Sequence, residues 1–278
     1  MRARIAKFTV LNVAANPHPD GIYHKIFSKA AEAEGRPYGR NWFAKVGKPS
    51  PSQDGFFHGR IAIWHELKGK AIETSSLERQ DLASLLNDDA EGFGFPSKVF
   101  SFTFREADHL LFCEFKNDEG DLITPSSLGK ALQKVLVATA ADLGIDLSVT
   151  VLPEHDTIEQ IFELAVVKKI SLGFSLPNSG DDLSQEKRIL IERLKRQGIN
   201  KQKSEYTKAK SVETIEIDDE LRAEIEVGAE NGKVVATGVD TEGHKKIIDT
   251  TQRPTIIEKT MAAEDSSVGV LRTLAQEI

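Results

Sequence analysis

Residues 98–104 read Lys-Val-Phe-Ser-Phe-Thr-Phe, and this stretch decides the fold class. Phenylalanine recurs at positions 100, 102 and 104, so an extended chain places all three rings on one face. A turn is expected at 107–109, and the apolar stretch 110–116 then returns as a second strand. The sequence therefore predicts a pair of neighbouring strands with one face buried.

Helices and strands mix irregularly on both sides of this pair. In the first half we expect strands at 4–13, 56–66, 70–75 and 146–152, and helices at 22–33 and from Ser126 or Ser127 to Leu143. In the second half we expect helices at 157–164, 184–197, from 218 and at 268–278, strands at 168–176, 205–214, 233–239, 245–249 and near 256–257, and a hairpin turn at 231–232. No steady βαβ rhythm is present, so the predicted class is α+β, with mixed, largely antiparallel sheets and packed helices in two subdomains. We place an N-terminal α+β domain at 1–154 and a C-terminal α+β domain at 155–278.

Composition narrows the class of protein. The 278 residues are 40% hydrophobic and 28% charged, as in globular rather than disordered chains. Cys113 is the only cysteine, which excludes an internal disulfide and a zinc site built from several thiolates, and we expect it to be a small buried hydrophobe. No signal peptide and no apolar run of about 20 residues is present, so we expect a cytoplasmic protein without a membrane partner.

Charge is distributed unevenly along the chain. Residues 187–210, here called the basic block, hold nine Lys or Arg and two acids, although the net charge of the chain is -7. Residues 213–230, the acidic block, hold eight carboxylates and one arginine. A local positive field favours a polyanionic partner, because phosphate neutralisation releases condensed counterions. The alternative is a solvated helix whose charges only keep the surface soluble.

The expected elements of the basic block place its cations on one surface. Leu183, Leu190, Ile191 and Leu194 form an apolar stripe, which turns much of the charge of the 184–197 helix outward. Tyr206, Lys208 and Lys210 alternate along the strand that we expect next, so they could share a face. A cationic helix beside a cationic strand would suit the phosphates of a DNA duplex, because lysine positions backbones rather than reading bases. The predicted nucleic-acid-binding residues are Lys168, Lys169, Arg188, Arg193, Lys195, Arg196, Lys201, Lys203, Lys208 and Lys210.

Catalytic signatures are mostly absent from the sequence. It contains no phosphate-binding glycine loop followed by Lys-Ser or Lys-Thr, no nucleophile elbow and no His-Glu-x-x-His, and we predict no catalytic residue, cofactor or metal site. One alternative is a metal-dependent nuclease or defence effector. Glu114 and Lys116 share a strand face and could hold Mg²⁺ and an attacking water if Asp89 or Asp108 approached. The competing interpretation is an exposed Glu and Lys on the solvent face of that strand.

A third hypothesis is an interaction module. The basic block would then dock on the acidic block of its own chain or of a partner chain. Salt-sensitive self-association without nucleic-acid binding would favour this hypothesis.

The acidic and glycine-containing stretch 88–97, followed by the Phe-rich strands, resembles the phage lambda RexA family of exclusion proteins. Features of the second half, at 177–178, 231–236, 243, 250–251 and 254, resemble an uncharacterised bacterial and phage family. The resemblance implies a fold akin to the recombination-associated protein RdgC and a homodimer that binds double-stranded DNA without sequence specificity. It also implies a role in phage exclusion, in a prophage or phage-defence setting, or in nucleoid association. No DNA-contact motif of that family transfers residue by residue, so the site residues above rest on charge placement alone.

Overall fold

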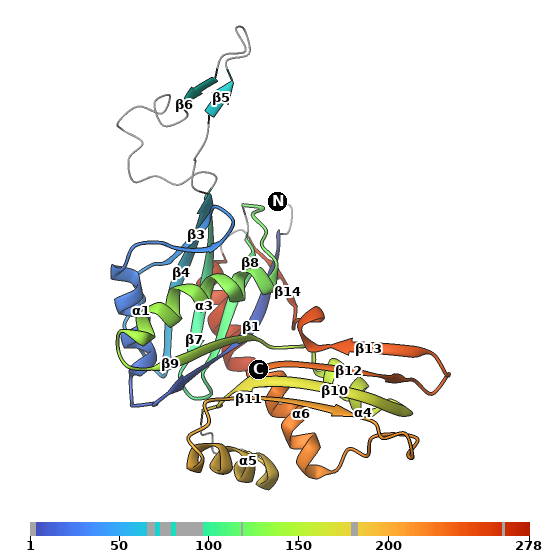
Figure 1. Ribbon diagram of the computed structural model, residues 1–278. Helices are drawn as coiled ribbons and strands as arrows, with labels where there is room; N and C mark the ends of the chain where they lie inside the picture. The colour runs from blue at the N-terminus through green and yellow to red at the C-terminus, as the bar shows by residue number, and fades with distance from the viewer. Residues whose placement is uncertain are drawn as a thin grey trace.

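The computed structural model describes residues 4–65, 70–72, 79–81, 97–117, 119–178, 183–262 and 265–278. Every strand pairing in these ranges is antiparallel, and helices cover the sheets, so the predicted α+β class is confirmed. The strands form one sheet of eight, one sheet of four and a separate pair, β5 (Lys70–Ile72) with β6 (Arg79–Asp81). Figure 1 shows the two large sheets and the helices around them. No helix in the described ranges is long and apolar enough to span a membrane.

The eight-stranded sheet contains the predicted pair of strands at its centre. Its order is β14-β1-β8-β7-β4-β3-β2, and β9 also pairs with β1. The strands are β1 (Arg4–Asn16), β2 (Arg36–Gly39), β3 (Trp42–Val46), β4 (Phe56–His65), β7 (Ser97–Arg105), β8 (Leu110–Lys116), β9 (Asp146–Val151) and β14 (Ile257–Met261). Phe100, Phe102 and Phe104 are fully buried on one face, as the alternation predicts.

Helices cover both faces of this sheet. On the face with the three phenylalanines lie α1 (Ile22–Glu32) and α3 (Pro125–Ala141). The opposite face packs against α7 (Ser267–Glu277) through a smaller apolar cluster that includes Phe8, Phe112 and Leu271. Cys113 faces the larger core and is fully buried, as expected, and burial raises the pKa of its thiol.

In the described ranges, three helices of the second half of the chain pack on one face of the four-stranded sheet. Its order is β11-β10-β12-β13, with β10 (Val166–Ser175), β11 (Lys201–Thr207), β12 (Gly232–Val239) and β13 (Lys245–Asp249). The helices are α4 (His155–Phe162), α5 (Gln185–Arg196) and α6 (Asp219–Asn231), and the short 3-10 helix η2 (Thr250–Gln252) follows β13. Leu190, Ile191 and Leu194 of the predicted stripe are buried against this sheet.

Two sequence predictions for the second half are wrong in detail. The expected strand at 205–214 begins earlier and ends at Thr207, because the following residues form an irregular segment. The expected hairpin turn at 231–232 is instead the end of α6 and the start of β12, since the Asn231 amide bonds back to the Val227 carbonyl.

Asparagine side chains join the two sheets where β1 passes the small sheet. The Asn12 amide donates to the Asn231 side chain at 2.8 Å and to the Glu230 carbonyl at 3.0 Å. The Asn16 amide donates to the Leu176 carbonyl at 2.9 Å. The division into domains 1–154 and 155–278 stays a prediction, but strand β14 pairs with β1, so this late segment belongs to the first sheet.

Candidate nucleic-acid interface

The basic block lies on two opposite faces of the four-stranded sheet. Along β11, burial alternates, so that Gln202, Ser204 and Tyr206 turn toward the helices while Lys201 and Lys203 are exposed on the other face. Helix α5 packs on the helix-covered face. The expected single surface of a cationic helix and a cationic strand is therefore wrong, because the sheet separates the two sets of charges.

On the helix-covered face, the Glu224 carboxylate is the centre of a hydrogen-bonded network. It accepts from the Tyr206 hydroxyl at 2.5 Å, from the Gln202 amide at 3.1 Å and from the Arg193 guanidinium at 3.2 Å. Burial, followed by the contact with this carboxylate, raises the pKa of Tyr206 to about 12. Arg193 thus ties α5 to α6 and the sheet, and it acts as a structural residue here.

Lys187 makes a second link between the basic and acidic blocks. Its ammonium lies 3.0 Å from the Glu226 carboxylate and 3.1 Å from that of Glu230, both on α6. Burial alone would lower the pKa of Lys187, but the two carboxylates outweigh it and raise the pKa. Contacts of the kind that the third hypothesis expects, between the basic block and the acidic block, thus occur within the chain at Lys187 and Arg193.

The other predicted residues are spread over several surfaces. Arg188, Lys195 and Arg196 occupy exposed positions on α5. Lys168 is exposed on β10, and Lys210 is exposed in the segment after β11. Lys169 pairs with Glu205 at 3.0 Å across β10 and β11. The Lys208 ammonium donates to the loop carbonyls of residues 209 and 212, so it does not share a strand face with Tyr206 as expected.

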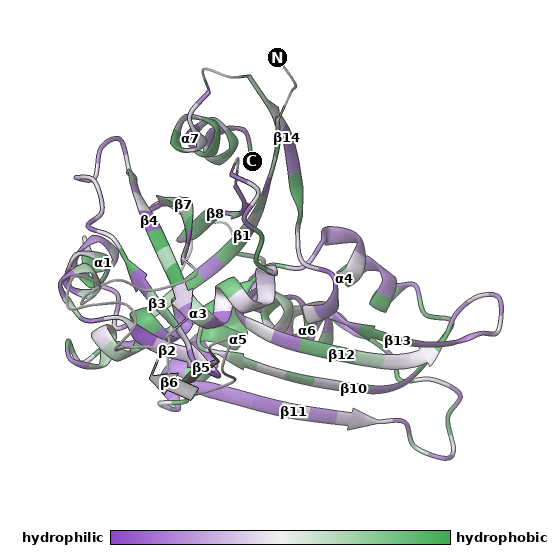
Figure 2. Ribbon diagram, turned by 90° about the horizontal axis from the view of Figure 1, so that it is seen from above, coloured by the Kyte–Doolittle hydropathy of each residue, from purple (hydrophilic) through white to green (hydrophobic). Residues whose placement is uncertain are grey.

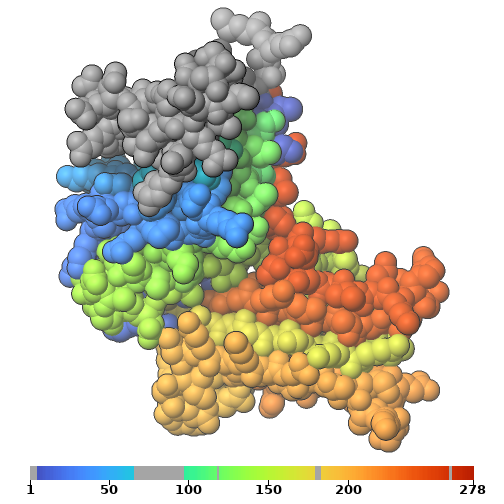
Figure 3. Space-filling view, turned by 45° about the horizontal axis from the view of Figure 1, so that its top comes forward, coloured from blue at the N-terminus to red at the C-terminus, as the bar shows by residue number. Residues whose placement is uncertain are grey.

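A groove of about 1060 Å³ runs between the two large sheets. One wall is the helix-free face of β10, β11 and β12, and the other is formed by α3 and the edge strand β9. In Figure 3, the green region of α3 and β9 meets the yellow-to-orange strands of the second sheet at this junction. Strand β11 is hydrophilic along nearly its whole length in Figure 2, because both of its faces carry polar side chains.

The charge of the groove is strongly biased. Among the residues that the structure describes, the lining contains four lysines, Lys130, Lys201, Lys203 and Lys233, and one acid, Glu205. Lys233 is neutralised by Asp249 at 2.8 Å, and Glu205 by Lys169. Within the part of the chain that the structure describes, the other three lysines of the lining make no ion pair, so their charge faces the groove.

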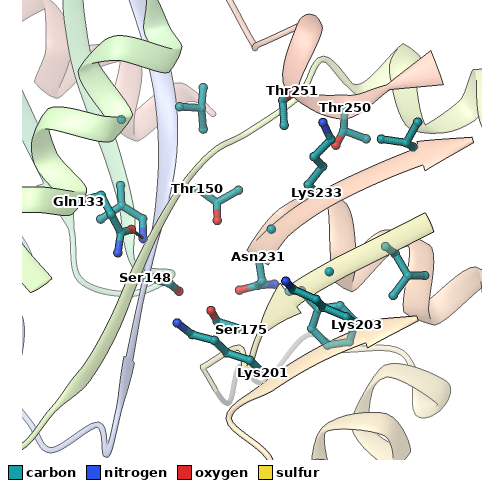
Figure 4. Close-up of a pocket in the computed structure, with 18 of the residues that line it drawn as sticks. Gln133, Ser148, Thr150, Ser175, Lys201, Lys203, Asn231, Lys233, Thr250 and Thr251 are labelled. Carbon is teal, nitrogen blue, oxygen red and sulfur yellow. Dashed lines mark hydrogen bonds between the residues drawn. The ribbon is translucent and has the colours of Figure 1, made fainter. Parts of the chain in front are cut away.

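Neutral hydrogen-bonding groups surround these lysines. Ser148 and Thr150 project from β9 toward the groove, opposite Ser175, Lys201 and Lys203 (Figure 4). The remaining polar side chains of the lining include Ser126, Gln133, Ser171, Asn231, Thr250, Thr251 and Gln252. Hydroxyl, amide and ammonium donors are the groups that proteins use to contact phosphate oxygens.

Gln133 supports the wall formed by β9. Its side-chain oxygen accepts from the Val149 backbone N–H at 2.5 Å, and its nitrogen donates to the Leu147 carbonyl at 3.4 Å. The amide thus satisfies backbone groups on the edge of β9 that faces away from β1. Gly129 lets α3 approach this strand, because a Cβ there would lie 2.7 Å from the Val151 side chain.

Sequence reasoning missed the α3 and β12 contributions to the groove. The signal available was a polar stripe at 126, 129, 130 and 133, which helical spacing places on one side of α3. Nothing in the sequence said that this side faces Lys201 and Lys203, because the approach of the two sheets depends on contacts distant along the chain.

The Glu114 region is built differently from the expectation. Glu114 is 2% exposed, with one carboxylate oxygen accepting from the Ser101 N–H at 3.1 Å and the other from the Ser267 hydroxyl at 2.9 Å. The exposed glutamate of the competing interpretation is therefore wrong, since α7 covers this face. Asp108 is held by Arg105, and Asp89 lies outside the described residues. The nuclease alternative stays a prediction, and no contact in the described residues favours it.

Comparison with known proteins adds a family. A search of curated proteins gave no match to this chain. Most of the 88–97 stretch that resembles the RexA family lies outside the described residues, so that resemblance stays a prediction. One family model, described as "Domain of unknown function (DUF4747)", matches residues 4–276. Because this match covers nearly the whole sequence, the chain belongs to the DUF4747 family.

Proposed function

We propose that this protein binds double-stranded DNA without sequence specificity, through backbone phosphates held in the groove between its two sheets. The observation that carries the proposal is the charge of the lining: four lysines and one glutamate, in a chain whose net charge is -7. Such a concentration of cations acts locally, because salt screens charges that lie more than about 8 Å away at physiological ionic strength.

The kinds of side chain in the groove favour backbone contacts over base reading. The described residues of the lining include no arginine, the residue that most often recognises guanine through two hydrogen bonds. Its single aromatic residue, Phe174, is 4% exposed, so unpaired bases find no ring to stack on there. A duplex presents its phosphates outward and keeps its bases stacked, which fits a lining of lysines, hydroxyls and amides.

The biological role is part of the proposal. The RexA-like stretch supports phage exclusion or nucleoid association, and the same resemblance supports a homodimer in which two grooves would act on one duplex. Two sites on one polymer raise the apparent affinity by increasing the local concentration of the second site. The proposal assigns the main phosphate contacts to Lys201 and Lys203 rather than to the cations of α5.

The test compares two charge reversals on opposite faces of the second sheet. Lys201→Glu with Lys203→Glu changes the groove, and Lys195→Glu with Arg196→Glu makes the same change of net charge on α5. We expect the groove variant to lose duplex binding in a fluorescence anisotropy titration across salt concentrations. The matched α5 variant should keep most of the affinity and nearly all of the salt slope, which is about -0.9 per phosphate neutralised.

Circular dichroism and thermal melting would show that both variants are folded. A folded groove variant that binds duplex as tightly as the wild type would overturn the assignment to the groove. Equal losses in both variants would mean that only net charge matters, and this result also contradicts the proposal.

A further inference from the structure

A second candidate surface lies on the eight-stranded sheet, on the face that points away from the core formed by α1 and α3. No residue of β3, β4 or β7 belongs to the described lining of the groove. The strands β3, β4 and β7 alternate between the core and this face, with Ile61, Ile63 and Phe100 pointing inward. The outward positions include Phe43 and Lys45 on β3, Arg60, Ala62 and Trp64 on β4, and Val99 on β7.

Two aromatic rings are held together on this face. Phe43 lies directly opposite Trp64 in the strand register, and their rings stack with centroids 6.0 Å apart and planes 22° apart. Gly35 lets the backbone pass close to the far edge of the indole, because a Cβ at that position would lie 2.2 Å from the indole ring. The rings are partly exposed, so the sheet offers a pre-ordered aromatic surface to solvent.

The charge of these strands is entirely positive. β3, β4 and β7 contain no Asp or Glu, in a chain that has 43 acidic residues. Lys45 and Arg60 share the outward face with the two rings, and neither forms an ion pair with any residue that the structure describes. The carboxylate on this side of the neighbouring strand β8, Glu114, is 2% exposed beneath α7, so among the described residues the charge that these three strands present to a polyanion is positive.

Part of this face remains open to solvent in the described ranges. Helix α7 lies on the same side of the sheet but packs on β7 and β8 (Figure 2). Phe112 and Leu271 are buried at that contact. Beyond it, Val99 is 42% exposed, although it is apolar, and Arg60 is also exposed. Apolar and aromatic groups left in water, beside cations that make no ion pair with a described residue, are the features of a binding surface rather than of a core.

We propose that this face binds single-stranded nucleic acid, with unpaired bases stacking on Phe43 and Trp64 and phosphates contacting Lys45 and Arg60. Aromatic side chains on a sheet face suit unpaired bases, because every base presents a π surface of similar size. Paired bases in a duplex are already stacked on each other, so a blunt duplex gains little here. The proposal rests on this face alone and is independent of the groove.

Trp64 itself supplies the readout. The chain contains two tryptophans, so Trp42→Phe leaves Trp64 as the single reporter. We would titrate this variant with oligothymidylate, with oligouridylate of the same length and with a blunt duplex, and follow tryptophan emission. Both single strands should quench Trp64, the duplex should not, and a preference between the two single strands would identify DNA or RNA as the partner.

Two surface variants test the residues without threatening the core. Phe43→Leu removes one ring and should weaken single-strand binding by about fivefold or more, in line with the loss of stacking on one base. Arg60→Gln changes an exposed side chain and should reduce the salt slope by about one phosphate contact. The groove variant Lys201→Glu with Lys203→Glu should leave the quenching of Trp64 intact.

The contradicting results are equally distinct. Unchanged Trp64 emission at saturating single strand, in protein that melts normally, would overturn the proposal. Equal single-strand affinity in the wild type and in the Phe43→Leu and Arg60→Gln variants would overturn it as well, even if Trp42→Phe failed to fold. Loss of quenching in the groove variant would show that the single strand binds in the groove instead.

Discussion

The two faces of the four-stranded sheet receive cations from the same basic block but use them differently. On the helix-covered face, Arg193 and Lys187 lie beside carboxylates of α6 and hold the helices to the sheet. On the open face, Lys201 and Lys203 point into a groove and make no ion pair with a described residue. A count of charges along the chain therefore does not measure the charge available to a partner. The side chains of β11 point alternately to the two faces of the sheet, and this alternation determines which lysines face the groove.

The difference also separates stability from binding. A buried carboxylate that has lost its partners is costly, whereas an exposed lysine contributes little to folding. Changes on the helix-covered face should therefore affect unfolding, and changes on the open face should affect binding. The following predictions test that division.

The largest effect is expected from Glu224→Ala. This change leaves Arg193, Gln202 and Tyr206 without their shared acceptor, so we expect a loss of about 3 kcal/mol in the free energy of unfolding. Urea denaturation would measure it. Glu220→Ala, at an exposed position on the same helix, is the matched control and should cost less than about 0.5 kcal/mol. Duplex affinity measured well below the melting temperature should not change, and a large loss of affinity would break the comparison.

The next effect is expected from Lys201→Gln with Lys203→Gln. Removal of two phosphate contacts should weaken duplex binding by about 2 kcal/mol at physiological salt and reduce the salt slope by about 2. The free energy of unfolding should stay within about 0.5 kcal/mol of the wild type, because neither ammonium has an ion pair in the described residues to lose. A marked loss of stability would show that these lysines belong to the folded network after all.

A smaller effect is expected from Gln133→Ala in the opposite wall. The change leaves the Val149 N–H and the Leu147 carbonyl without their partner, so we expect a loss of about 1–2 kcal/mol in the free energy of unfolding. Lys134→Ala on the exposed side of α3 is the control. Hydrogen exchange at the Val149 amide should rise in the first variant only, and unchanged protection would contradict this role.

The smallest effect is expected from a change of pH, which should alter the stability of the fold but not the affinity for duplex DNA. Burial, and after it the neighbouring His18, whose ring centroid lies 4.5 Å away, outweigh the opposing effect of Asp108 and together lower the pKa of His109 to about 4. The unfolded chain, with an ordinary histidine pKa near 6.5, thus binds more protons, and stability should fall as pH drops from about 6.5 to about 4. His109→Gln should flatten thermal melting in this window. Duplex affinity should not vary between pH 6 and 8, because the groove cations are lysines.

Much of the fold could be predicted because local patterns agree with the final packing. The period of two at 98–104 placed β7, and the apolar stripe of 184–197 placed α5 with its buried face. The predicted turn at 231–232 failed because Asn and Gly also end helices, and the side-chain bond of Asn231 to its own helix decides between the two. The pair Asn-Gly is therefore compatible with a hairpin turn and with the end of a helix, and local sequence does not distinguish them.

The candidate site was predictable only in part. The charges of Lys201 and Lys203 were visible, but their separation from Lys195 and Arg196 depends on which strand face packs against α5. Lys130 and Gln133 of α3 come within reach of the same groove only through contacts between the sheets. Such contacts join residues more than a hundred positions apart, as in the bond from Asn16 to Leu176, and no short pattern encodes them.

The pairing of β1 with β14 has a consequence for how the protein is made. Residues 4–8 form a ladder with 257–261, so the first of these segments is synthesised roughly 250 residues before its partner. Until then, the neighbouring apolar residues Phe8 and Phe112 have neither β14 nor α7 to cover them. Contacts between residues so far apart in the sequence form slowly, and apolar surface stays exposed until they have formed. Nascent chains of this protein should therefore depend on chaperones until synthesis has passed residue 277.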